Sequence, residues 1–550
     1  MSNFQTILCW ILTYLYLSDL WVTLGIFPGA LPSAKMAQGA PRLKENGMLC
    51  FLCMLLGLGM QAPQPVSAAV AKPVEPAALS VPFTTGSAAA RDALEHGVVK
   101  WENHRMAEAV DDYRKAAKAD PNFAVAHLYL STLTPNPEEQ AAELRKAVAL
   151  RGEATADERL LINWLAYTSQ NQILEAISAM NELLGRYPKD KHLLYRTAIW
   201  FRNQRQLNRA VPLYERLLQL DPQFADALNQ LGYIYAFQGE SDKAIAHMKR
   251  YVAVLPNEPN PEDSYAEICR MAGRYDEAIA HYRRALKIEP SYWSSEEGIA
   301  ATYSLMGDQT RARAEYAIAI EHAPSPASQL LWTMNSAVTW VRDNDYAKAS
   351  AIYRDVARRA HDNNLAELES GAYRNMSLYE KDPAVRRQLL DQAEAALQHS
   401  HPISTLVSEQ QTALVLRARL YAEIDARHPE AASRILEQLA AIAEKTHNGF
   451  IQVAYHGAAG AVLAAQGKYE DAIGELLEDD RNPYTLRFLI MAYQKTSAAA
   501  EASRWSARLN NVKNPTLEQL LATSTALATQ TTETSKADCP SCLRWENAEW

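Results

Sequence analysis

The sequence predicts an all-α fold, a right-handed superhelical solenoid of roughly twelve helix pairs over residues 90–515. Three observations predict it, because proline, alanine and glycine each recur with the same period of 34 residues. The positions are Pro188, Pro222, Pro256, Pro290 and Pro324; Ala176, Ala210, Ala244, Ala278 and Ala312; and Gly239, Gly273 and Gly307. Three residue types with one shared period indicate a repeated unit rather than a domain with a single core.

The unit over residues 225–256 shows what each residue type does. Its first helix has apolar side chains at three- and four-residue spacing, which makes one apolar face: Leu228, Leu231 and Tyr235. Gly239 ends this helix, where the chain needs a left-handed residue. A second helix follows, with the small Ala244 where the two helices cross, and Pro256 stops it.

This pattern resembles the tetratricopeptide repeat (TPR), a 34-residue helix-turn-helix with Leu-Gly-x-x-Tyr followed by Ala, Tyr, Ala and Pro. The residues that carry the resemblance are Leu231-Gly232-Tyr233-Ile234-Tyr235 with Ala244 and Pro256, and Ala278, Tyr282, Ala285 and Pro290. The regular array covers residues 90–324 in about seven units, although the Trp expected early in the first helix is missing. The resemblance implies a TPR superhelix.

Residues 325–515 are expected to continue as a divergent, TPR-like helical array. The period is lost between residues 364 and 450, where the helices look longer, and it returns at Gly467–Ile473. A last helical pair is expected from Tyr484 to about Leu509. Residues 516–550, rich in Thr and Ser, are expected to form a disordered tail.

Residues 1–71 form an apolar leader with two alternative interpretations. Residues 48–60 have the length of a signal-peptide h-region, preceded by basic residues and followed by small residues that favour cleavage after Ala68 or Ala71. The alternative is a retained membrane anchor at residues 4–27, and the true start stays open between Met1 and Met36. Residues 72–89 are predicted to be a linker. We therefore expect an exported protein, periplasmic or in the cell envelope, with association to a membrane through its N-terminus as the alternative.

Composition and motifs argue against several function classes. The net charge of −9 and the pI near 5.9 disfavour a nucleic-acid binder. The chain has no phosphate-binding Gly-rich loop, no His-Glu-x-x-His zinc helix and no Gly-x-Ser-x-Gly elbow, so no catalytic residues, cofactor or metal site are predicted. Cys539 and Cys542 are expected to form a small local disulfide, whereas Cys269 takes a core position of the repeat.

The resemblance also implies a concave groove, lined by the first helix of each unit, that binds extended peptides or partner helices. Applied to this chain, the groove positions of the family are His192, Tyr195, Arg202, Asn203, Asn229, Tyr233, Phe237, Asp263, Glu267 and Arg270. Each of these residues could equally be a solvated surface residue. The favoured function is a non-catalytic scaffold that binds envelope proteins; the alternatives are a module of polysaccharide synthesis or export, and the substrate-holding arm of an enzyme.

Overall fold

The computed structural model describes residues 80–531 except for residues 104, 135 and 400–404. Residues 80–184 and the described residues from 188 onwards belong to one compact unit, which contains the candidate site. The predicted leader and the Cys539–Cys542 pair lie outside the described residues.

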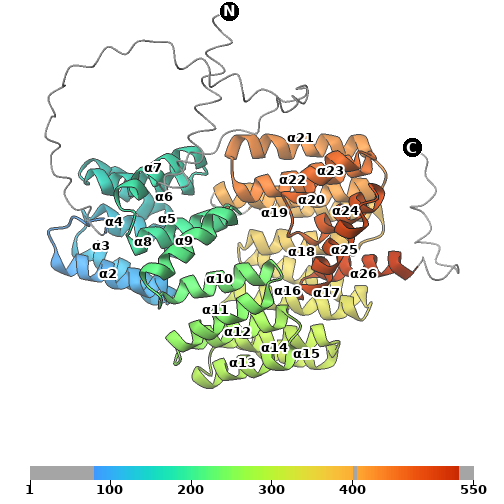
Figure 1. Ribbon diagram of the computed structural model, residues 1–550, viewed down its shortest axis with the longest axis horizontal. Helices are drawn as coiled ribbons and strands as arrows, with labels where there is room; N and C mark the ends of the chain where they lie inside the picture. The colour runs from blue at the N-terminus through green and yellow to red at the C-terminus, as the bar shows by residue number, and fades with distance from the viewer. Residues whose placement is uncertain (1–79, 104, 135, 400–404, 532–550) are drawn as a thin grey trace, which may run out of the picture. The chain divides into compact units, whose positions relative to one another are not determined.

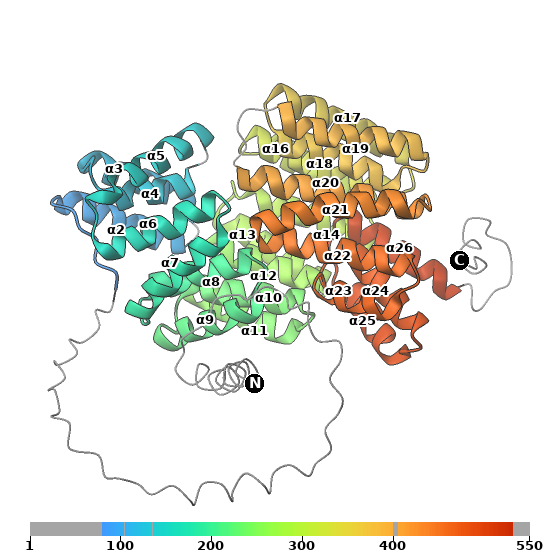
Figure 2. The ribbon, with the colours of Figure 1, turned by 90° about the horizontal axis from the view of Figure 1, so that it is seen from above.

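All regular elements of the described residues are helices, and their order follows the predicted repeat (Figure 1 and Figure 2). The helices of the regular array are α2 (Ala88–Glu102), α3 (Met106–Ala119), α4 (Ala124–Leu133), α5 (Pro137–Ala149), the 3-10 turn η1 (Leu150–Gly152), α6 (Ala156–Ser169), α7 (Ile173–Arg186), α8 (Lys191–Asn203), α9 (Leu207–Leu220), α10 (Ala225–Phe237), α11 (Ser241–Val254), α12 (Pro259–Met271), α13 (Tyr275–Ile288), α14 (Trp293–Met306) and α15 (Gln309–Glu321). The later helices are α16 (Pro326–Arg342), α17 (Tyr346–Asp362), α18 (Ala366–Tyr379), α19 (Pro383–His399), α20 (Thr405–Asp425), α21 (Pro429–Thr446), α22 (Gly449–Ala465), α23 (Tyr469–Leu477), α24 (Pro483–Lys495), α25 (Ala499–Asn511) and α26 (Leu517–Thr531).

In the part of the chain that the structure describes, the α-helices from α2 to α25 form twelve consecutive pairs, followed by α26. The all-α solenoid of roughly twelve pairs is therefore confirmed. The seams between helices are filled as the repeat predicts: Ala244 and Tyr214 are fully buried. Cys269 is fully buried as well, in agreement with its predicted core position.

The turn between the two helices of a unit requires a left-handed residue at one position in successive repeats. Glycine supplies it with φ of 80° at Gly239, 74° at Gly273 and 91° at Gly307. One and two periods earlier, Arg205 and Asn171 adopt φ of 59° at the same position without being glycine. The backbone period therefore extends further towards the N-terminus than the glycine pattern does.

The loss of period after residue 324 has a simple cause, because the helices there are longer. Helices α16, α17, α19 and α22 have 17 residues each, and α20 has 21, whereas α8 to α13 have 13 or 14. Longer helices stretch the units from α16 to α21 beyond 34 residues, so the spacing of prolines and glycines no longer repeats there. The last predicted pair is α24 and α25.

The structure differs from the sequence-based boundaries at both ends of the array. The segment assigned to a tail at residues 516–550 begins with helix α26, which packs on α16, α18 and α24. The segment assigned to a linker at residues 72–89 ends in a bound stretch, residues 80–86, followed by the first turn of α2. Both segments lie on first helices of the pairs.

Two turns of the early repeats contact the turn between α21 and α22, far away in sequence. Asn448 Nδ2 donates to Asn171 Oδ1 at 3.1 Å, and the Gly449 amide donates to Gln204 Oε1 at 2.8 Å. A Cβ at Gly449 would lie 1.8 Å from the carbonyl oxygen of Gln204, so only glycine fits this backbone approach.

In the described residues, no helix is long and apolar enough to cross a membrane.

Candidate functional site

An extended stretch of the chain, residues 80–86, lies across the N-terminal ends of α4, α6 and α8. The Val81 amide donates to Asp190 Oδ2 at 2.8 Å, and the Thr84 amide donates to Glu158 Oε1, also at 2.8 Å. The Thr84 hydroxyl donates to the same Glu158 carboxylate, and the Thr85 hydroxyl donates to Asp120. Three carboxylates from three successive repeats therefore hold one extended segment.

Asp190 and Glu158 are placed by the start of a first helix, and Asp120 by the end of the second helix that precedes one. Asp190 is the N-cap of α8 and accepts from the Leu193 amide at 3.1 Å, which leaves its second oxygen for Val81. Glu158 is the third residue of α6 and completes a capping box with Thr155. Asp120 ends α3 just before α4. Because the repeat brings the starts of successive first helices side by side, helix caps form a row of hydrogen-bond acceptors.

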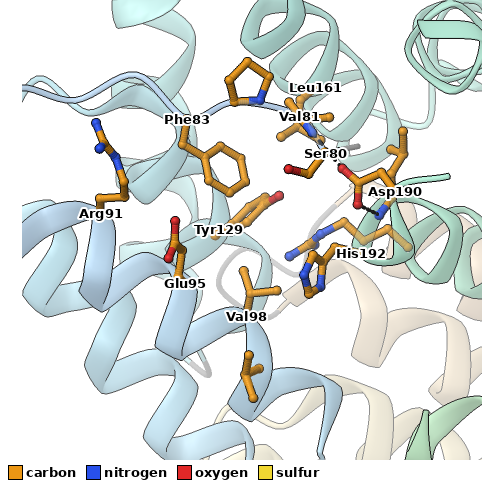
Figure 3. Close-up of a pocket in the computed structure, with 14 residues that line it drawn as sticks. Ser80, Val81, Phe83, Arg91, Glu95, Val98, Tyr129, Leu161, Asp190 and His192 are labelled. Carbon is orange, nitrogen blue, oxygen red and sulfur yellow. Dashed lines mark hydrogen bonds between the residues drawn. The ribbon is translucent and has the colours of Figure 1, made fainter. Parts of the chain in front are cut away.

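A cavity of ≈ 650 Å³ lies beside this segment. Helices α2, α4, α6 and α8 and the segment itself contribute its walls. The lining residues are Ser80, Val81, Pro82, Phe83, Arg91, Glu95, Val98, Val99, Tyr129, Leu161, Asp190, His192, Leu193 and Arg196. Figure 3 shows Phe83 directed from the segment towards Tyr129 of α4, and their ring centroids are 6.1 Å apart. First helices of the repeats thus form one side of the cavity, and the extended segment of residues 80–86 forms another.

Arg196 forms a buried, positively charged part of the cavity wall. Its side chain is 8% exposed, and its guanidinium lies 3.8 Å from the Tyr129 ring centroid and 4.2 Å from that of Trp101. Its Nε has no hydrogen-bond partner. Burial opposes its charge, but Tyr129, Tyr113 and Glu102 outweigh burial and raise its pKa. The wall therefore keeps a positive charge among aromatic rings.

Helix α2 is tied to α8 next to the cavity. His192 Nδ1 lies 2.6 Å from Glu102 Oε1, and the rings of Trp101 and Tyr195 are 4.9 Å apart. Burial lowers the pKa of His192, but the hydrogen bond and the charge of Glu102, together with the charge of Asp190, outweigh burial, so the net pKa is raised above 6.5. These contacts join the first repeat to the fourth.

Models of the tetratricopeptide repeat match residues 192–223, 213–246 and 264–292. The first stretch covers α8 and α9, the second runs from α9 through α10 into α11, and the third covers the second half of α12 and all of α13. The chain therefore contains tetratricopeptide repeats. No curated protein matches the sequence.

Three solved TPR structures are similar to this chain in part. A tetratricopeptide repeat protein from Parabacteroides merdae is 17% identical over 56% of this chain and 98% of its own, with a TM-score of 0.32. Yeast Tom70 is 12% identical over 82% of this chain and 97% of its own, with a TM-score of 0.34. YrrB, described as a TPR protein with an unusual peptide-binding site, is 15% identical over 33% of this chain and 92% of its own, with a TM-score of 0.25.

The predicted groove residues fall into four groups. His192 lines the cavity. Tyr195 and Asn229 do not face a groove, because they are 2% and 3% exposed and are enclosed between helices; Tyr195 donates to Asp226. Phe237 and Asn203 are exposed at the ends of their helices.

The remaining predicted residues form a polar network among the first helices α8, α10, α12 and α14. Tyr233 donates to Glu267 Oε2 at 2.7 Å, and Arg270 Nη2 donates to Glu267 Oε1 at 2.8 Å. Asp263 accepts from Ser295 at 2.6 Å, and burial raises its pKa to about 7. Arg202 pairs with Gln230. Because Arg270 is only 5% exposed and its partners belong to the protein itself, this network joins adjacent repeats.

Sequence reasoning did not find the residues that hold the extended segment. Asp190, Glu158 and Asp120 precede or begin first helices, whereas the family's groove positions were counted along the helices. A signal was available, because Thr155 with Glu158 is a capping box. The segment itself, Val81-Pro82-Phe83-Thr84-Thr85, has apolar and β-branched residues in a stretch interpreted as a linker.

Proposed function

We propose that this protein is a non-catalytic scaffold that binds extended segments of partner proteins along the first helices of its repeats. The observation that carries the proposal is the protein's own segment 80–86, held in this way by Asp190 and Glu158. Two of its hydrogen bonds come from backbone amides, which every residue except proline offers. The same carboxylates can therefore bind the backbone of a different chain.

Side chains supply selectivity at the same place. Val81 is 8% exposed, and Phe83 enters the cavity wall opposite Tyr129. The cavity extends beyond these residues, so a partner segment with an aliphatic and an aromatic residue two positions apart would bury both. A partner of this kind replaces residues 80–86 and uses the same acceptors.

We also propose that the scaffold acts outside the cytoplasm, in the periplasm or cell envelope. The support is the leader pattern, with a short apolar region, preceding basic residues and small residues before Ala68 and Ala71. N-terminal sequencing of the mature protein tests it. A mature chain that starts after Ala68 or Ala71 agrees with export, and one that retains residues 48–60 contradicts cleavage.

The binding proposal is tested with the full chain and its own segment as the probe. Thr84→Pro removes the amide that binds Glu158 and loosens the internal segment. A fluorescein-labelled peptide of residues 80–87 is then titrated against this variant and the parent, and its fluorescence anisotropy is measured. We expect tighter binding to the variant, because in the parent the internal segment competes.

Two matched controls identify the binding surface. Glu158→Gln keeps a residue that completes a capping box but weakens the acceptor, so it should weaken peptide binding in the Thr84→Pro chain. A peptide with proline in place of Thr84 lacks the amide and should bind weakly. Equal binding by both peptides, or no effect of Glu158→Gln, would show that this surface does not recognise extended backbone.

A further inference from the structure

Three consecutive repeats place three side chains at equivalent positions, one near the end of the first helix and two on the second. The sets are Tyr235, Lys243 and His247; Cys269, Glu277 and His281; and Tyr303, Arg311 and Glu315. In both flanking repeats a basic side chain covers an aromatic ring. Lys243 Nζ lies 5.2 Å from the Tyr235 centroid, and the Arg311 guanidinium lies 5.6 Å from that of Tyr303.

The middle repeat replaces both partners of this contact. Cys269 takes the place of the tyrosine and Glu277 takes the place of the basic residue, so a fixed cation is exchanged for an anion. The ligand atoms of Cys269, Glu277 and His281 all lie within 4.8 Å of one another. Cys269 is fully buried and His281 is 8% exposed, whereas the Glu277 side chain is 33% exposed and opens the cluster to solvent.

A second carboxylate orients the histidine. Glu262 Oε2 lies 2.5 Å from His281 Nδ1, and the Tyr265 ring lies 3.8 Å from the imidazole, centroid to centroid. Arg284 Nη2 also faces Nδ1. Once that guanidinium turns away, a neutral ring that donates Nδ1–H to Glu262 keeps its lone pair on Nε2. Carboxylate–histidine pairs of this kind fix the tautomer of metal-binding histidines. The cluster therefore has both potential ligands and an outer residue that orients one of them.

Two arginines neutralise the carboxylates in the absence of an ion. Arg274 Nη2 lies 2.5 Å from Glu277 Oε2, and Arg284 Nε lies 3.0 Å from Glu262 Oε2 with its guanidinium also against His281. Both arginine side chains are about half exposed, at 48% and 46%, so they can turn into solvent when a cation enters.

We propose that Cys269, Glu277 and His281 bind a divalent transition-metal ion of the zinc type. Thiolate, imidazole and carboxylate are the protein ligands that zinc takes, and three protein ligands leave a fourth position for water. Tetrahedral ligands at ~2.0–2.3 Å from an ion stand about 3.5 Å apart, a spacing that small side-chain rotations reach from the present cluster. The sequence predicted no metal, because the three residues match no zinc motif. The site is independent of the segment-binding function.

Metal binding must displace a proton. A cysteine that binds a metal does so as the thiolate, so binding releases the thiol proton. Glu262, Glu277, Arg274 and Arg284 are the charged groups around the thiol and imidazole.

The test uses the full chain with Cys9, Cys50, Cys53, Cys539 and Cys542 changed to serine, so that Cys269 is its only cysteine. Co²⁺ is titrated into this parent while thiolate-to-cobalt charge-transfer absorption is recorded, and Zn²⁺ is then added in competition. We expect one equivalent of Co²⁺ to bind with that absorption, and Zn²⁺ to displace it. Zn²⁺ should also raise the unfolding midpoint of the parent.

Two variants distinguish the site from adventitious binding. Cys269→Ala should lose the charge-transfer absorption, and Glu277→Lys, which installs the residue found at Lys243, should weaken Co²⁺ binding at least about tenfold. Circular dichroism shows whether each variant keeps its helices. A cobalt spectrum that survives Cys269→Ala, or a folded parent that binds neither Co²⁺ nor Zn²⁺ at micromolar concentration, would overturn the proposal.

Discussion

Segments from both ends of the described chain lie on first helices of the repeats, but different interactions hold the two segments in place. Near the start, residues 80–86 are extended and bound mainly through backbone amides and hydroxyls to carboxylates. Near the end, α26 is helical and packs on α16, α18 and α24 through apolar side chains. Leu517 of α26 is 3% exposed and belongs to the same core cluster as Leu330 and Val338.

The difference indicates which end can exchange its occupant. A backbone hydrogen bond contributes about 0.5–1.5 kcal/mol net, and a competing strand can make the same bond. A buried leucine contributes more and fits a particular set of neighbours. The start of the array therefore holds a replaceable segment, whereas α26 completes a core.

The largest expected effect is at α26. Leu517→Ala should lower the free energy of unfolding by about 2–5 kcal/mol, because it leaves a cavity among Leu330 and Val338. Urea denaturation followed by circular dichroism measures this. Ser524→Ala, on the same helix but exposed, is the matched control and should have little effect. A loss below about 1 kcal/mol for Leu517→Ala would mean that α26 is not part of the core.

A smaller loss in the free energy of unfolding is expected at the contact that joins early and late repeats. Gly449→Ala places a Cβ 1.8 Å from the Gln204 carbonyl oxygen, and the backbone must shift at a cost of about 1–3 kcal/mol. Hydrogen exchange should show faster exchange in the turn at Gln204 as well as at residue 449. Gly185→Ala, where a Cβ would meet nothing within 4 Å, serves as the control. Faster exchange at residue 449 alone would show that the stability of the turn at Gln204 does not depend on this contact.

At the replaceable segment the expected loss is about 1–2 kcal/mol. Thr84→Pro removes both the amide and the hydroxyl hydrogen bond to Glu158, and Thr84 is otherwise exposed. Limited proteolysis should cut residues 80–86 faster in this variant while the helices stay intact. Thr84→Val, which loses only the hydroxyl, should be cut more slowly than Thr84→Pro. Equal protection of Thr84→Pro and the parent would contradict the role of the amide.

The smallest effect is a pH dependence of the contact between α2 and α8. Because Glu102 raises the pKa of His192, their pairing stabilises the fold fully below pH 6.5 and is lost as the pH rises through the raised value. The His192 side chain is 45% exposed, so solvent screening keeps the effect below about 1 kcal/mol. Hydrogen exchange in the last turn of α2 should quicken over this range. His192→Gln should remove the dependence; an unchanged pH profile in that variant would assign it to another group.

Local sequence patterns predicted the helix pairs well, because Pro256, Gly239 and Ala244 act within their own unit. They could not reveal that Arg205 and Asn171 take the left-handed conformation, since neither residue is glycine. Of the residues predicted for the groove, only His192 lines the cavity of the candidate site. Asp190 and Val81 are 109 residues apart, and their contact depends on how successive units stack rather than on local spacing. Helix α26 was missed because its threonines and serines outweighed the leucines at residues 517, 520 and 521.

The contact of Asn171 with Asn448 has a consequence for how the chain folds and responds to force. In an open solenoid each repeat contacts only its neighbours, so folding can begin at any repeat and spread along the array. A hydrogen bond between residues 277 positions apart closes a very large loop and raises the contact order. Folding should therefore end with a slow step in which the contact between Asn171 and Asn448 forms. A pulling force must break this contact before the repeats between the two residues extend.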